Sequence, residues 1–315
     1  MFPCLRSLLD PAALLALISR DYRLTGLERV VLLRSLVNDV YRVDTTDRTY
    51  VLKVYRSGWR SPDEVAWEVD LIAHLHRAGV AVSPPVARTD GDPIGVIDAP
   101  EGPRPAMLSE FTAGSDPSQP FTGPLYRDFG RLIGQLHDAG ADFTSGHHRP
   151  PADLTHLLDR PLAAILPLLA DRPADRAGIV ALADTARRRL AELSADDPAR
   201  GICHGDVSMD NVRLTPDRRL VIHDFDLSGE GWLAGDLCGV RATPWWDDFA
   251  AGYTELRPLR PVDLQAIPWL DVVTRISNLA FHLIDKPSWR GTETLSEGYL
   301  ERDLDALRVA GRALR

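Results

Sequence analysis

The pattern of hydrophobic residues changes once, near residue 112, and this change limits the fold more than any other feature of the chain. Before it come three short runs rich in β-branched and aromatic residues, separated by turn signals, at 30–33, 40–43 and 50–55. Such runs are typical of an antiparallel meander. Beyond this point strand signals nearly vanish and long helical periods follow. The chain is therefore predicted to be α+β, with an N-terminal sheet and a mainly helical C-terminal part.

Capping and turn signals predict where the elements begin and end. Asp10 before Pro11 indicates a first helix, and Ser61 before Pro62 a second, which ends near Gly79. Two more strands are expected around 94–97 and 106–108, and the segment 201–227 is expected to be loop, hairpin and loop. Helical periods in the C-terminal part cover 123–140, 152–170, 174–194, 244–256, 262–284 and 296–314, with connectors at 141–151 and 285–292.

Composition limits the partners of the chain. With 315 residues, 44% hydrophobic and 26% charged, the chain is long enough for two globular lobes. The net charge is −9 and no Lys or Arg run exceeds three residues, so a nucleic acid partner is not expected. No uncharged apolar stretch reaches about 18 residues, so no membrane span is expected. Three cysteines without a CxxC pair favour a reducing, cytoplasmic setting. The sequence does not indicate the oligomeric state.

One short stretch combines acids and an amide at a spacing that favours phosphate chemistry. His204-Gly205-Asp206 is followed by Asn211 and then by Asp224-Phe225-Asp226. Two short strands between Asn211 and Asp224 predict a hairpin, which would bring these two residues together at its open end. Carboxylate and amide oxygens are the ligands that magnesium prefers. Asp206 is then a candidate base for a hydroxyl group that receives a phosphoryl group.

This stretch resembles the aminoglycoside phosphotransferase family, and its D-x-D run is closest to the homoserine kinase-like and stress-response-kinase-like branches. The resemblance implies a bilobal protein-kinase-like fold, with a nucleotide-binding lobe over 1–112 and a helical lobe with catalytic loop and acceptor site over 113–315. It also implies roles for six residues: Asp206 as catalytic base, Asn211 and Asp224 as magnesium ligands, Asp226 as second-choice ligand, Asp236 as support of the catalytic loop, and His204 as its brace.

Lys53 is the candidate phosphate-binding residue of the first part. Its neighbours Leu52 and Val54 are apolar, so alternation along a strand would turn the lysine toward a cleft. The resemblance implies that Lys53 holds the α- and β-phosphates and pairs with an acid on the following helix. Glu68 fits this role, and Glu64 is the alternative. A solvated strand lysine is the simpler structural interpretation.

Two further nucleotide contacts are expected. The turn after the first strand, residues 34–40, lacks the glycines that protein kinases place over the phosphates, so Ser35 and Asn38 are candidate donors there, although a plain hairpin turn explains them as well. The resemblance implies that adenine meets the backbone of the segment Ser109-Glu110-Phe111.

Aromatic and charged residues in the helical part are candidates for the acceptor side. They are Trp245, Trp246, Asp247, Asp248, Asp271 and Arg275. Aromatic faces and acids could bind a polyhydroxylated or amine-bearing compound. Core packing and an ordinary helix start explain the same residues.

The sequence therefore predicts a magnesium-assisted kinase that transfers the γ-phosphoryl group of ATP, or GTP, to a hydroxyl of a small molecule, such as an aminoglycoside-like antibiotic or a hydroxylated metabolite. In an antibiotic-modifying role it would confer resistance. A protein serine/threonine kinase of the stress-response type is an alternative. A metal-dependent hydrolase built on His204, Asp206, His223 and Asp224 is a more distant alternative, as is a nucleotide-binding scaffold without catalysis.

Overall fold

The computed structural model describes residues 2–314. Contacts divide these residues into two compact units. Unit 1 contains the described residues up to Ser118 together with Asp142–Arg149 and Met209–Asp226. Unit 2 contains Gln119–Ala141, Pro150–Ser208 and the described residues from Leu227 onward. The functional division expected between residues 112 and 113 stays a prediction.

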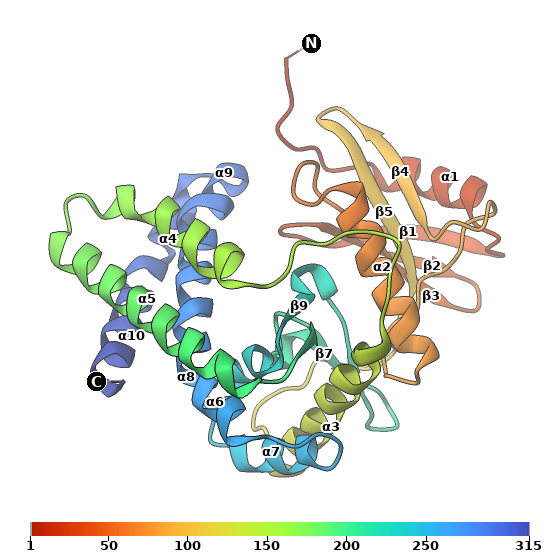
Figure 1. Cartoon of the computed structure of the whole chain (residues 1–315). Helices are drawn as coiled ribbons and strands as arrows, with labels where there is room; N and C mark the ends of the chain where they lie inside the picture. Colours follow the sequence, from red (N-terminus) through yellow and green to blue (C-terminus); the bar gives the residue numbers. More distant parts are fainter. Residues whose placement is uncertain (1, 315) are drawn as a thin grey trace. The chain divides into compact units, whose positions relative to one another are not determined.

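Unit 1 is built on a five-stranded antiparallel sheet with strand order β1-β2-β3-β5-β4 (Figure 1). The strands are β1 (Leu27–Ser35), β2 (Asp39–Thr45), β3 (Thr49–Val54), β4 (Ile94–Ala99) and β5 (Gly102–Glu110). Short turns join β1 to β2, β2 to β3 and β4 to β5, which is why these consecutive strands pair. The predicted meander and the two later strands are confirmed.

Two helices pack on this sheet. In α1 (Pro11–Asp21), Asp10 caps the first turn by accepting from the Ala12 N–H at 2.8 Å. Leu14 and Ile18 of α1 are buried against the sheet, and burial of such a side chain stabilises the fold by roughly 1.5–3 kcal/mol. The second helix, α2 (Pro62–Arg77), starts with a capping box and carries a buried face. Both predicted helix starts are confirmed.

The predicted hairpin is also confirmed, and it belongs to unit 1. Its strands are β7 (Val212–Leu214) and β8 (Leu220–Ile222). Leu214 exchanges two backbone hydrogen bonds with Ser115, at 2.8 and 3.1 Å, and the Ile222 N–H donates to the Ala81 carbonyl at 3.0 Å. Gly114 is required at this approach, because a Cβ there would lie 2.2 Å from the Leu214 carbonyl oxygen. These contacts fix the hairpin to the earlier chain of unit 1.

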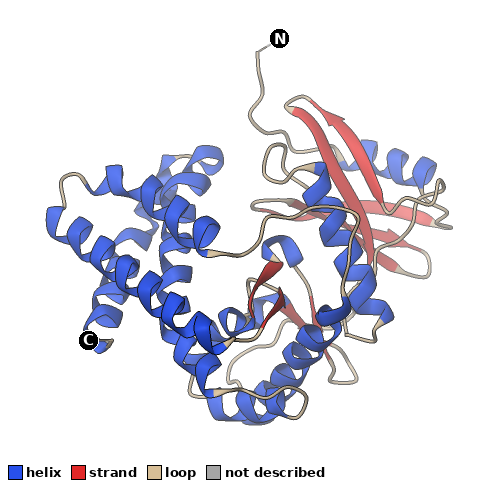
Figure 2. Cartoon of the chain, viewed as in Figure 1, coloured by secondary structure: helices blue, strands red, loops and turns tan. Residues whose placement is uncertain are grey.

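Unit 2 is mainly helical (Figure 2). Its α-helices are α3 (Gly123–Ala139), α4 (Arg160–Ile165), α5 (Pro173–Leu193), α6 (Cys238–Arg241), α7 (Trp246–Thr254), α8 (Pro261–Ala280), α9 (Lys286–Arg290) and α10 (Tyr299–Ala313). The helix α3 packs on α7, and α5 packs on α8. A short antiparallel pair, β6 (Arg200–Cys203) and β9 (Gly229–Trp232), completes the unit.

Three details differ from the sequence predictions. The helix expected over 152–170 is broken into a π-helical turn (Thr155–Asp159), α4 and a 3₁₀ turn (Leu166–Leu169), because prolines within it lack the N–H that a continuous helix needs. The connector predicted over 285–292 is wrong, since it contains α9, whose first turn accommodates a proline. The pair β6 and β9 was not predicted, because its strands have only four residues each. None of the helices in residues 2–314 is long and apolar enough to cross a membrane.

Candidate active site

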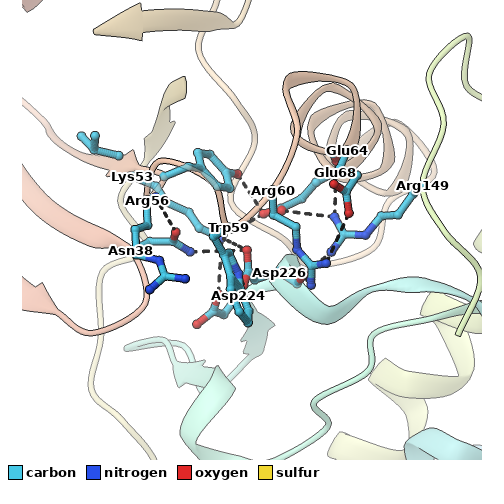
Figure 3. A network of polar contacts seen from close by, with 12 residues as sticks. Asn38, Lys53, Arg56, Trp59, Arg60, Glu64, Glu68, Arg149, Asp224 and Asp226 are labelled. Carbon is cyan, nitrogen blue, oxygen red and sulfur yellow. Dashed lines mark hydrogen bonds and ion pairs between the residues drawn. The ribbon is translucent and has the colours of Figure 1, made fainter. Parts of the chain in front are cut away.

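Lys53 is the centre of the candidate site in unit 1. Leu52 and Val54 on either side of it join the core under α1, so strand alternation turns Lys53 to the other face of the sheet. There its Nζ lies 2.9 Å from Glu68 Oε1 of α2 (Figure 3). Only 12% of the Lys53 side chain and 1% of the Glu68 side chain are exposed, so both charges need close partners of opposite sign.

The start of α2 explains why Glu68, and not Glu64, contacts the lysine. Ser61 Oγ accepts from the Glu64 N–H at 3.2 Å, and Glu64 Oε2 accepts from the Ser61 N–H at 2.8 Å. Glu64 also forms an ion pair with Arg60 at 3.3 Å. Its carboxylate therefore closes the first turn of the helix. Glu68 lies one turn later, on the buried face.

Lys53 keeps its positive charge although it is buried. Burial alone lowers the pKa of an amine, but the charge of Glu68, helped by Tyr55, Asp224 and Asp226, outweighs it and holds the pKa of Lys53 well above its usual value. The Tyr55 hydroxyl donates to Glu68 Oε1 at 2.9 Å, and burial raises the pKa of that hydroxyl well above its usual value, with Glu68 adding to the effect. At neutral pH this centre therefore contains an ammonium ion beside a neutral phenol.

The hairpin brings Asn211 and Asp224 together, as expected from their positions. Val212 pairs with Ile222, and the His223 N–H donates to the Asn211 carbonyl at 2.9 Å. Asp224 follows with a φ of 67°, in the left-handed region that aspartate tolerates better than most residues.

The Asp224 carboxylate faces two cations. Its Oδ1 lies 3.4 Å from Lys53 Nζ, and its Oδ2 accepts from Arg34 Nη2 at 3.0 Å. The Asp224 side chain is 27% exposed. This geometry links the acid of the hairpin to the lysine of the sheet.

Asp226 is held more tightly than Asp224. Its Oδ2 accepts from Trp59 Nε1 at 2.7 Å, and its Oδ1 lies 3.4 Å from Asn38 Nδ2 and 3.9 Å from Lys53 Nζ (Figure 3). The residue is 7% exposed. Both acids of the D-x-D run thus lie beside Lys53, and Asp224 is the more accessible one. Their metal-binding roles stay predictions.

The donor set around Asp224 fits a hard divalent cation. The Asp224 carboxylate is a hard oxygen ligand, and the backbone of Asn211 is bonded to the adjacent His223, so the amide of Asn211 comes from the same end of the hairpin. Across residues 2–314, no group of three or more His, Cys, Asp or Glu side chains is arranged to hold a metal. Magnesium at Asp224 would therefore take further ligands from phosphate oxygens and water, as it commonly does.

Arg149 is a member of the site that the sequence analysis did not identify. Its side chain is 2% exposed, its Nη1 lies 3.5 Å from Glu68 Oε2, and its Nη2 donates to the backbone carbonyl of Asp226. Arg60 Nη2 donates to the same carbonyl at 2.7 Å. The guanidinium of Arg149 also lies over the Trp67 ring, 5.5 Å from its centroid. Arg149 thus joins the acid of α2 to the backbone of the D-x-D run (Figure 3).

The other predicted nucleotide contacts make internal hydrogen bonds. Ser35 Oγ donates to Asp39 Oδ1 at 2.6 Å, and Asn38 Oδ1 accepts from the Arg56 N–H at 3.1 Å. In the segment expected to meet adenine, the Glu110 and Phe111 N–H groups donate to backbone carbonyls at 3.1 and 3.2 Å. Ser109 Oγ donates to the Val51 carbonyl at 3.5 Å, and the guanidinium groups of Arg42 and Arg213 lie over the Phe111 ring, 5.8 and 5.2 Å from its centroid. Their nucleotide contacts stay predictions.

Unit 2 contains His204, Gly205 and Asp206, the first residues of the stretch that predicted phosphate chemistry, in the loop after β6. Asp236 accepts from the backbone N–H groups of His204 at 2.7 Å and Gly205 at 2.8 Å, and its Oδ2 lies 3.0 Å from His137 Nε2. Burial raises the pKa of the Asp236 carboxyl, but the His137 hydrogen bond and the nearby partners outweigh this, and the pKa is lowered. His137, which the sequence analysis missed, is oriented by the Tyr253 hydroxyl at 2.9 Å.

Asp206 is exposed at the end of this loop, as a base for a hydroxyl group must be. Its N–H donates to Nδ1 of the completely buried His204 at 3.3 Å, and the N–H of His204 in turn donates to Asp236. Gly205 has a φ of 83°, and a Cβ there would lie 2.2 Å from the Leu227 carbonyl oxygen. These contacts suit the bracing roles expected of His204 and Asp236, which stay predictions along with the catalytic role of Asp206.

The residues expected on the acceptor side all lie in unit 2. Trp245 stacks on Tyr126 with ring centroids 6.2 Å apart, and Trp246 stacks on Phe249 at the same distance. Both tryptophans therefore have packing partners.

The charged members of this set lie on two helices. Asp247 and Asp248 are in the first turn of α7, and Asp271 forms an ion pair with Arg275 at 2.7 Å along α8. Acceptor binding by any of these residues stays a prediction.

Comparison with known proteins identifies relatives over most of the chain. A family model described as "Phosphotransferase enzyme family" matches residues 30–261. An uncharacterised protein of Deinococcus radiodurans is 39% identical over 319 aligned positions, covering 97% of this chain and 91% of that protein. A homoserine kinase of Xanthobacter autotrophicus is 29% identical, covering 86% of this chain and 82% of that enzyme.

A microcompartment-associated aminopropanol kinase is similar in structure, with a TM-score of 0.79 at 24% identity, covering 96% of this chain and 97% of that one. At this identity the likeness concerns the fold. The predicted class, with an N-terminal antiparallel sheet and a largely helical C-terminal part, is confirmed.

Proposed function

Because the chain belongs to the phosphotransferase enzyme family, we propose that it transfers the γ-phosphoryl group of ATP to a hydroxyl group of a small molecule. The family itself and the class of enzyme agree with the sequence prediction. The observation that carries the proposal is the buried Lys53 ammonium, held by Glu68 with Asp224 at 3.4 Å. Such a centre matches the lysine, helix acid and metal acid of phosphoryl-transfer enzymes. GTP is the alternative donor.

The proposal gives each part of the centre a task. Lys53 binds the α- and β-phosphates, and Glu68 keeps its ammonium in place. Asn211 and Asp224 hold magnesium, with Asp226 as a further ligand or as the anchor of the loop. When bound, magnesium offsets the negative charge of the phosphates.

The acceptor hydroxyl group needs a base, which we propose is Asp206. Asp206 orients the acceptor hydroxyl and takes its proton as the oxygen attacks the γ-phosphorus. Asp236 and His204 keep the loop of Asp206 in one conformation through the backbone hydrogen bonds described above. Catalysis then depends on positioning and charge, as expected for phosphoryl transfer.

For the acceptor we propose a small amino alcohol. Two of the similar proteins are a homoserine kinase and an aminopropanol kinase, whose names both describe a hydroxyl compound that carries an amine. The acidic residues Asp247, Asp248 and Asp271 would suit such a cation. Hydroxylated antibiotics are the second group of acceptors. Because the chain has three free cysteines, we place the reaction in the reducing cytoplasm.

An ADP-release assay with ATP, magnesium and a panel of amino alcohols and aminoglycosides tests this function. We expect turnover with at least one amino alcohol, and a loss of about 10²–10⁴-fold in kcat for Asp206→Asn. Asp210→Asn is the matched control, since this exposed acid lies in the same loop outside the proposed roles. Turnover of Asp206→Asn at the wild-type level would overturn the assignment of the base.

The protein-kinase alternative is tested in the same preparation. Labelled ATP is incubated with the enzyme and either a cell lysate or its small-molecule fraction. Label in metabolites supports the proposal, whereas label confined to protein bands would replace it with the protein-kinase function.

A further inference from the structure

The turn between β1 and β2 is where a kinase of this kind would contact phosphate, and its two candidate donors are engaged elsewhere. Ser35 Oγ donates to Asp39 and accepts from Arg6 Nη2 at 2.7 Å. Asn38 is 7% exposed and bridges the Arg56 backbone to Asp226. Moving either side chain toward a ligand would uncover a buried carboxylate, which is costly. A phosphate group bound at this turn would therefore need a hydrogen-bond donor other than Ser35 or Asn38.

Arg34 precedes Ser35 and Asn38 and, unlike them, has an exposed side chain. It lies next to the register shift at the end of β1, opposite Val40. Its side chain is 46% exposed and forms an ion pair with Asp224 Oδ2 at 3.0 Å. The guanidinium of Arg34 thus reaches the proposed metal ligand from the phosphate-covering turn.

Arg34 and a metal ion would compete for Asp224. Lys53 already lies at Oδ1, so Arg34 occupies the other oxygen of the same carboxylate. A divalent cation at Asp224 displaces a guanidinium, because both need the same lone pairs and repel each other. The ion pair is partly exposed and contributes little to stability, so it opens easily.

We propose that Arg34 is an exchangeable cation, which occupies Asp224 in the free enzyme, leaves when the metal-bound nucleotide enters, and then donates to the nucleotide phosphates. Its planar fork of N–H donors suits phosphate oxygens. It would supply the donors that the glycine-free turn does not. This inference rests on the proposed function only for the identity of the ligand as a nucleoside triphosphate.

A purely structural role for Arg34 makes a different prediction. If Arg34 only braced Asp224 in its left-handed conformation, its removal would weaken metal binding or leave it unchanged. If Arg34 competes with the metal, its removal strengthens metal binding in the absence of nucleotide. The direction of this change separates the two roles.

The test uses the full-length protein and the variants Arg34→Gln and Arg34→Lys, with Arg29→Gln as matched control. Arg29 lies in the same strand, is 64% exposed and pairs with Asp44, away from the site. The affinity for Mn²⁺ alone is measured by titration without nucleotide, and the KM for ATP is measured with a saturating acceptor.

We expect Arg34→Gln to bind Mn²⁺ more tightly than the wild type, by about threefold to fivefold, the range for loss of a partly exposed ion pair. We expect its KM for ATP to rise about tenfold, the effect of a lost charged hydrogen bond, with Arg34→Lys between the two. Arg29→Gln should match the wild type in both measurements.

Unchanged or weaker Mn²⁺ binding by Arg34→Gln, or an unchanged KM for ATP, would overturn the exchange. A wild type that binds no Mn²⁺ would also overturn it. If the wild type phosphorylates no acceptor, the proposed function fails, and titrations with Mn²⁺ and with the ADP–Mn²⁺ complex, which need no turnover, still decide the role of Arg34.

Discussion

Asp39, at the start of β2, is completely buried and still carries its charge, because three donors face it. Ser35 and Arg6 bond Oδ1 at 2.6 and 2.7 Å, and Arg104 bonds Oδ2 at 2.7 Å. Burial raises the pKa of this carboxyl, but the three hydrogen bonds outweigh burial and lower it. Arg104 is itself fully buried, so water cannot replace Asp39 as an acceptor for its guanidinium.

We therefore expect Asp39→Ala to reduce the free energy of unfolding by about 3–5 kcal/mol, the cost of leaving a buried charge without its partner. Urea unfolding measures this loss. Asp47→Ala, at an exposed turn, is the control and should stay within about 0.5 kcal/mol of the wild type. A loss below about 1 kcal/mol for Asp39→Ala would mean that Glu101, at 3.5 Å, and the backbone carbonyls that Arg104 already contacts are sufficient for its charge.

At the scale of elements, two glycines allow α3 and α7 to approach closely. A Cβ at Gly130 of α3 would lie 2.0 Å from the Phe249 carbonyl oxygen, and a Cβ at Gly252 of α7 would lie 1.9 Å from the Arg127 carbonyl oxygen. Backbone atoms on both sides cannot move aside as a flexible side chain can. The spacing of the two helices therefore depends on the absence of side chains at these positions.

Gly130→Ala should destabilise unit 2 by about 1–3 kcal/mol. Alanine is the better helix former, but the steric cost of the added Cβ is larger than this gain in helix propensity. Gly178→Ala in α5 is the matched control: nothing lies within 4 Å of a Cβ there, so this change should stabilise the protein by up to about 1 kcal/mol. Thermal unfolding compares the two variants. Equal effects of the same sign would contradict this account of the α3 and α7 contact.

The same pair of helices should respond to acid. Glu255, just after α7, accepts from Arg131 and, at 2.7 Å, from Arg127, both on α3, and these bonds lower its pKa from 4.5 to about 2. A lowered carboxyl pKa stabilises the folded state fully above the unfolded value near 4.5 and loses this effect as the pH falls toward 2. Glu255→Gln should therefore be less stable than the wild type at pH 6, with a difference that shrinks between pH 5 and about 2.5. Urea midpoints across this range measure it, and a constant difference would rule out titration of Glu255 as its cause.

Sequence patterns predicted the elements whose signals are local. Asp10 and Ser61 identified two helix starts, and Lys53 was identified because a charged residue interrupts an apolar strand. Arg149 could not be found in this way. It lies in a segment predicted as a connector, and its partners are brought to it only by the folded chain. For Arg34 a signal existed, namely a positive charge in a glycine-free turn, but only the contact with Asp224 gives it a role.

At the scale of the whole molecule, unit 1 is assembled from three separate segments of chain. The hairpin in the last segment carries Asp224 and is bonded to the chain at Ala81 and Ser115. A fragment that ends at residue 118 contains the complete sheet but lacks these partners.

We expect the fragment 1–118 to be less stable than the same residues joined to 209–226 by a flexible linker, because the short fragment exposes the surface that the hairpin covers. Circular dichroism and amide hydrogen exchange of the two polypeptides test this. Equal protection of the β3 amides in both would show that the sheet does not need the hairpin.

The interleaved chain also affects how such enzymes can exchange parts by recombination. The chain passes between the units five times, so a crossover between residues 118 and 209 joins the sheet of one parent to the hairpin of the other. Lys53 and Asp224 would then come from different parents. After a crossover beyond residue 226, Lys53 and Asp224 come from the same parent. Only a segment of unit 2 is exchanged, and it includes the proposed acceptor residues. Under the proposed function, gene shuffling would therefore change the acceptor more readily than the centre formed by Lys53 and Asp224.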